Sequence, residues 1–190
     1  MHPAEHRALR ELHAFTGQLR RHWSSLAGRV GGDEAVPLRA GAEAAGELQR
    51  ELEDVTTARG LATEQMVRVA SRFATARPAI PDRALERNQA LRFAALDAQH
   101  VVTLLGYVAN LAAGDGDGDD ELRTFCTRWE RKLRTHERAV RLAAIALGER
   151  PDEAIRPADG SPAGRAAAKV NAGIGAFGEW VDRRSAAKRG

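Results

Sequence analysis

The sequence predicts an all-α protein, organised as an antiparallel up-down four-helix bundle with an additional C-terminal helix. Aromatic residues make up only 5% of the 190 residues, while Ala, Arg, Leu and Glu dominate, so local preferences are helical nearly throughout. Glycine and proline breakers separate four long segments that carry apolar residues at helical spacing. Their similar lengths allow them to pack side by side around one core.

The first helix is predicted over residues 3–30, with proline in its first turn and Gly31-Gly32 as its stop. The second is predicted over residues 37–77 and is closed by prolines. Gly60 interrupts its apolar stripe and is expected to bend this helix.

The third helix is predicted to start at Asp82 as its N-cap and to end at Gly114. The acidic turn that follows lacks the ligand order and closing glutamate of a calcium loop, so it is interpreted as a helix connection. The fourth helix is predicted over residues 119–147, and Gly148 terminates it. Residues 1–148 are therefore expected to form the bundle.

Residues 149–190 are expected to form a linker and a basic C-terminal helix that packs on the bundle or on a partner. Ser161 and Pro162 are typical of an N-cap and a first-turn proline. The net charge is +3, and residues 160–190 contain six basic and two acidic side chains. Nucleic acid or an anionic membrane is therefore expected, if at all, only at this tail. Its cations are Lys169, Arg183, Arg184, Lys188 and Arg189.

Three of the predicted helices interrupt an apolar stripe with a polar side chain. On the third helix, one stripe is expected to face the core and contains His100 together with Phe93, Leu96 and Tyr107, and Asp97 flanks it. Arg59 on the second helix and His136 on the fourth interrupt their stripes in the same way. Counting from the turns of an up-down bundle places Arg59, Asp97, His100 and His136 in one layer near mid-bundle.

This layer has three interpretations. It can be a structural ion-pair network in which Arg59 pairs with Asp97, and Tyr107 offers a further core polar partner. It can be an iron, manganese or zinc site formed by Asp97, His100 and His136, although Arg59 would repel a cation. It can also be a pocket in which Arg59 binds an anionic small molecule.

The third helix has a second apolar stripe opposite His100, and a helix with two apolar faces needs two neighbours. This stripe consists of Leu91, Ala94, Ala95, Ala98, Val102, Leu105 and Ala109. We expect either the C-terminal helix or another subunit to cover it.

Function is constrained mainly by what the chain lacks. The sequence contains no P-loop, no Gly-x-Gly-x-x-Gly after a strand and no evident Ser-His-Asp or Cys-His arrangement, which argues against an enzyme. No secretory signal or transmembrane segment is expected, and the lone Cys126 suits a cytoplasmic protein.

The leading hypothesis is a non-catalytic helical-bundle protein, without a cofactor, that acts by association with itself or with a protein partner. The alternative is a metal- or small-ligand-binding bundle of ferritin-like architecture, with a redox or sensory role.

Overall fold

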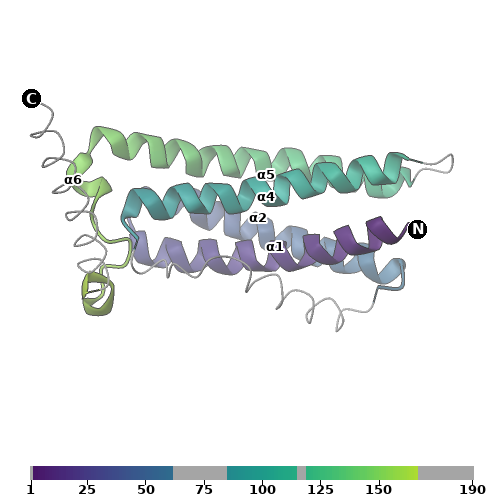
Figure 1. Cartoon of the computed structure of the whole chain (residues 1–190), viewed down its shortest axis with the longest axis horizontal. Helices are drawn as coiled ribbons and strands as arrows, with labels where there is room; N and C mark the ends of the chain where they lie inside the picture. Colours follow the sequence, from purple (N-terminus) through teal and green to yellow (C-terminus); the bar gives the residue numbers. More distant parts are fainter. Residues whose placement is uncertain (1, 62–84, 115–118, 167–190) are drawn as a thin grey trace, which may run out of the picture.

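The computed structural model describes residues 2–61, 85–114 and 119–166, and within these ranges the chain is helical apart from turns and one isolated β-bridge. Four long helices pack against one another, namely α1 (Pro3–Val30), α2 (Ala35–Ala58), α4 (Arg87–Ala113) and α5 (Asp120–Ala146) (Figure 1). These four helices are termed the helical body. A short 3₁₀ turn, η2 (Leu147–Glu149), and the one-turn helix α6 (Pro151–Ala154) follow at one end of it.

The helix order differs from the predicted up-down-up-down arrangement. At one end of the body, the Arg87 guanidinium donates to the Val30 carbonyl over 2.8 Å, so α4 begins where α1 ends. At the other end, Arg59 pairs with Asp119, so α2 ends where α5 begins. Because α2 and α4 therefore run in the same direction, the order is up, down, down, up. Each helix still contacts two antiparallel neighbours, α1 and α5 each packing on α2 and α4.

Helix α2 ends much earlier than predicted because Gly60 stops it. Gly60 has a φ of 69°, in the left-handed region that favours glycine, and its N–H bonds to the Thr57 carbonyl over 3.0 Å. The next N–H, that of Leu61, turns back to the Thr56 carbonyl over 3.0 Å. The rest of the predicted second helix, and the predicted N-cap Asp82, lie outside the described residues.

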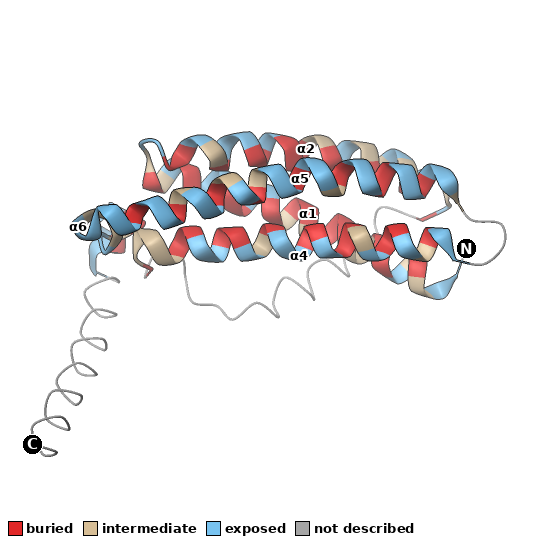
Figure 2. Ribbon diagram, turned by 90° about the horizontal axis from the view of Figure 1, so that it is seen from above, coloured by how far each residue is buried: buried red, intermediate tan, exposed pale blue. Residues whose placement is uncertain are grey.

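The core lies between the inward faces of the four long helices, each of which is buried along one side and exposed along the other (Figure 2). The two largest fully buried side chains are Trp23 on α1 and Trp129 on α5. The indole N–H of Trp23 donates to the Ala94 carbonyl of α4 over 3.1 Å. The predicted apolar stripes of α1 and α5 are largely buried, which confirms their orientation.

Helix α4 is rotated relative to the prediction. The alanine-rich stripe from Leu91 to Ala109, expected to need an outside partner, faces the core. The stripe expected in the core is mostly exposed, with exposed fractions of 39% for Phe93, 61% for Leu96 and 49% for Tyr107. The physical reason is close approach, because alanines on α4 leave room for large neighbours such as Trp23.

The chain after α6 returns to the start of α4. The Ala158 N–H bonds to the Leu85 carbonyl over 2.9 Å, and Ala158 is fully buried. Ser161 Oγ then accepts the Gly164 N–H over 3.0 Å, which confirms the predicted N-cap, and residues 162–166 are helical. None of the helices in the described ranges is long and apolar enough to span a lipid bilayer.

Candidate functional site

Arg59 does not reach mid-body, where the sequence predicted it. It lies one residue beyond the end of α2, donates to the Val55 carbonyl over 3.0 Å, and pairs with Asp119, the N-cap of α5. Burial alone would raise the pKa of Asp119. The N–H of Leu122, together with the hydrogen bond and charge of Arg59, outweighs burial and holds this pKa below its usual range.

Asp97 pairs with a histidine that the sequence analysis did not single out. Its Oδ2 lies 2.7 Å from Nδ1 of His22 on α1, and the His22 side chain is only 6% exposed. His22 directly precedes Trp23, so the helix that inserts the indole into the core also brings the imidazole to α4. A polar residue beside a large core aromatic was the signal that could have identified it.

His100 lies at the surface of the α1–α4 contact, and its side chain is 48% exposed. Its Nε2 is 3.6 Å from Glu11 Oε1, and its ring meets Phe15 edge to face with the centroids 4.4 Å apart. Tyr107, the predicted core polar partner, is also exposed. Asp97 and His100 therefore both face α1, with separate partners.

His136 lies half-buried on α5, within the field of Lys132 and of Glu47 on α2. Burial and then the charge of Lys132 hold the pKa of His136 below its ordinary value, although Glu47 acts in the opposite direction. Asp97 is on α4, which lies diagonally opposite α2 in the body, and its partner is on α1.

The predicted four-residue layer is consequently wrong, because it assumed that α2 continues past Gly60 and that His100 faces inward. In the described part of the chain, no three His, Cys, Asp or Glu side chains converge as a metal ion would require. The basic tail residues Lys169, Arg183, Arg184, Lys188 and Arg189 lie outside the described residues.

A groove with a volume of about 1290 Å³ lies between the outer faces of α4 and α5. It is termed the α4–α5 groove. Four exposed large apolar side chains line it, and their exposed fractions range from 39% to 61%. They are Phe93 and Leu96 on α4, and Leu142 and Ile145 on α5.

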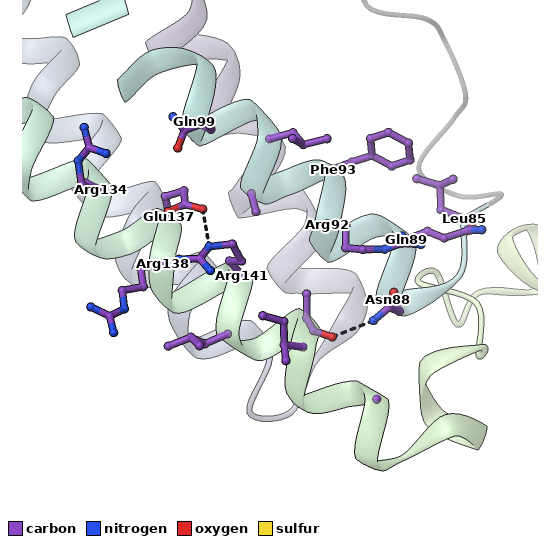
Figure 3. Close-up of a pocket in the computed structure, with 16 residues that line it drawn as sticks. Leu85, Asn88, Gln89, Arg92, Phe93, Gln99, Arg134, Glu137, Arg138 and Arg141 are labelled. Atoms are coloured by element: carbon purple, nitrogen blue, oxygen red, sulfur yellow. Dashed lines mark hydrogen bonds and ion pairs between the residues drawn. The ribbon is translucent and has the colours of Figure 1, made fainter. Parts of the chain in front are cut away.

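Arginines surround this apolar surface. The lining contains four of them and one carboxylate, Glu137. Glu137 is buried, and its Oε1 accepts from Nε of Arg141 over 3.1 Å (Figure 3). The cations are Arg92, Arg134, Arg138 and Arg141. The groove therefore combines exposed apolar side chains with a positive rim.

The walls of the groove are held in register by a polar contact between the two helices. The Asn88 side chain donates to the Ala144 carbonyl over 2.8 Å near the start of α4 (Figure 3). Because both walls are long helices and this contact fixes them, the groove exists before any partner binds.

Glu34, in the turn between α1 and α2, connects three segments at the end of the body where α4 begins. Its buried carboxylate lies 2.6 Å from Arg150 and 3.9 Å from Arg87. Burial alone would raise the pKa of Glu34, but a backbone hydrogen bond and the two arginines hold it below its ordinary value. One carboxylate thus joins the α1–α2 turn, the first residue of α4 and the segment after η2.

The groove could not be predicted from the sequence while Phe93 and Leu96 were expected in the core. Leu142 and Ile145 could have indicated the groove, because they lie outside the main apolar stripe of their helix and close in sequence to Arg138 and Arg141. Apolar residues off the core stripe can indicate a second contact face.

Comparison with protein-family models found none that matches the chain, and comparisons with curated proteins and with solved structures found no match.

Proposed function

We propose that the chain is a non-catalytic four-helix-bundle protein of the cytoplasm that acts by association, with the α4–α5 groove as the surface that binds another polypeptide. The observation that supports this proposal is the gathering of Phe93, Leu96, Leu142 and Ile145 in one groove on two rigid helices. Single exposed apolar residues are common on protein surfaces, whereas several in one recess are typical of an interaction site.

Site-specific photo-cross-linking in cells tests this function. A benzophenone amino acid replaces Leu142 inside the groove and, in the control variant, Val36 on α2, which is apolar, 57% exposed and outside the groove. We expect a discrete cross-linked species from position 142 and none from position 36. The added substitution Leu96→Gln should abolish the species from position 142, because it removes an apolar contact on the facing helix.

The mass of the species distinguishes the kinds of association. A mass of twice the chain indicates self-association, and any other mass indicates a different polypeptide. Equal cross-linking at positions 142 and 36, or none at position 142, contradicts the proposed function.

A further inference from the structure

We infer that the α4–α5 groove binds an acidic amphipathic α-helix of a partner protein, an inference that rests on the function proposed above. The dimensions of the groove favour a helix. Its lining runs from residue 88 to 99 on α4, and from residue 134 on α5 to residue 148 in η2. At a rise of about 1.5 Å per residue, these stretches are about 17 and 21 Å long, the length of a helix of roughly 11 to 14 residues.

The distribution of side-chain sizes favours the same occupant. Ala95 and Ala144 lie in the lining and are 5% and 2% exposed, so small residues form the deeper part of the groove. The larger Leu96 on α4 and Leu142 on α5 stand exposed on the two walls. A third helix can approach closely over the alanines while its apolar stripe contacts both walls.

The charge of the rim determines which helix fits. Among the described residues, Arg92 and Arg138 form no ion pair, so their charges are available to a partner. Arg134 and Arg141 are paired with carboxylates of their own helix. A helix that carries Asp and Glu on both sides of its apolar stripe would complement this rim, whereas a basic helix would be repelled.

Charge also argues against two other occupants. The segment 167–190 of this chain contains five basic and two acidic side chains, the same sign as the rim. A second copy that docked groove to groove would bring two sets of arginines together. An acidic helix from a different protein meets neither difficulty.

Binding of two synthetic peptides to the full-length chain tests this inference. Both are fluorescein-labelled helices of about 14 residues with the same leucine stripe, flanked by glutamates in one and by lysines in the other. Fluorescence anisotropy measures their affinities. We expect the acidic peptide to bind at least about tenfold more tightly, and this preference to shrink as salt rises from about 50 to 200 mM.

Two variants localise the binding. Leu96→Gln should weaken binding of the acidic peptide about tenfold, and Arg138→Glu about fivefold. Both residues are exposed, so neither change threatens the core. Val36→Gln is the control for the loss of an exposed apolar side chain and should leave the affinity unchanged.

Four outcomes overturn the inference. The first two are equal or tighter binding of the basic peptide, and no binding of either peptide. The third is an affinity for the acidic peptide that Leu96→Gln does not change. The fourth is displacement of the acidic peptide by anionic phosphatidylserine vesicles but not by excess unlabelled peptide. If the double variant Phe177→Ser/Trp180→Ser tightens peptide binding, the tail of the chain is the occupant and the choice of partner is wrong. The cross-linking experiment is independent, because it can succeed with a non-acidic partner while the acidic peptide fails.

Discussion

Trp23 on α1 fills the space that a side chain at position 41 of α2 would need. A Cβ atom added to Gly41 would lie 1.8 Å from Cζ3 of the indole, far closer than any van der Waals contact. Because the same indole donates to the Ala94 carbonyl, its position is fixed by three helices at once. The glycine is therefore required by packing, although it lies within a helix.

Gly41→Ala should destabilise the protein by about 3 kcal/mol, because the indole or the helix axis must move in a close-packed core. Gly28→Ala is the matched control, since a Cβ atom there meets nothing within 4 Å. It should be neutral or stabilise by up to about 1 kcal/mol, because alanine favours helix. Urea unfolding monitored by circular dichroism measures both. A Gly41→Ala protein as stable as the wild type would disprove the packing described.

Glu34→Gln should lower the free energy of unfolding by about 2 kcal/mol at neutral pH, because Arg150 and Arg87 lose a buried ionised partner. The folded-state pKa of Glu34 lies below its ordinary value of 4.5. The carboxylate therefore stabilises the fold above that value, and this contribution disappears as the pH falls through the lower folded-state pKa.

Urea titrations of the wild type and Glu34→Gln at a series of pH values test this dependence. The difference in stability should be constant from neutral pH down to about pH 5 and should shrink in more acidic solution. A difference that grew on acidification would contradict the assigned direction of the pKa shift. Asp119, whose pKa is also lowered, should add to acid destabilisation in both proteins equally.

Asp97→Asn should cost about 1 to 2 kcal/mol of stability, because it removes the charged partner of the buried His22. His100→Gln provides the comparison, since His100 is half-exposed and 3.6 Å from Glu11. Its effect should stay within about 0.5 kcal/mol, as for other exposed ion pairs. A double-mutant cycle on His22 and Asp97 measures their coupling. Equal costs for the two single variants would contradict the difference in burial.

Cys126 should be unreactive towards thiol reagents in the folded protein. It is fully buried, and burial raises the pKa of its thiol to about 12, so almost no thiolate is present at neutral pH. Labelling by dithionitrobenzoate should become fast only in denaturant, and its rate in buffer should report opening of the body. The variant Cys126→Ala/Thr127→Cys moves the thiol to an exposed neighbouring position and should label at once.

The sequence was sufficient where local signals agreed with packing. Helix α1 has its predicted bounds, with Gly31 at the C-cap. Helix α5 begins one residue after its predicted start, because the Asp119 side chain caps it by accepting the Leu122 N–H. These features depend on contacts between residues close in sequence. They are therefore readable without knowledge of the tertiary structure.

The orientation of α4 could not be read in this way, because both of its faces are apolar. Helical periodicity alone does not say which face packs inward, and the prediction placed the face with Phe93 and Leu96 in the core. The decisive factor was the shape of neighbouring helices, since Trp23 needs small residues opposite it. The predicted polar layer depended on this orientation of α4 and on an α2 that continues past Gly60. Because both assumptions were wrong, the layer was wrong as well.

The parallel course of α2 and α4 has a kinetic consequence. Helices α1 and α2 form one local hairpin, and α4 and α5 form another, because few residues separate the helices of each pair in the sequence. The contacts of α1 with α4 and of α2 with α5 join residues far apart in sequence. We therefore expect the hairpins to form first and their docking to limit the folding rate, because the long-range contacts require closure of a larger loop.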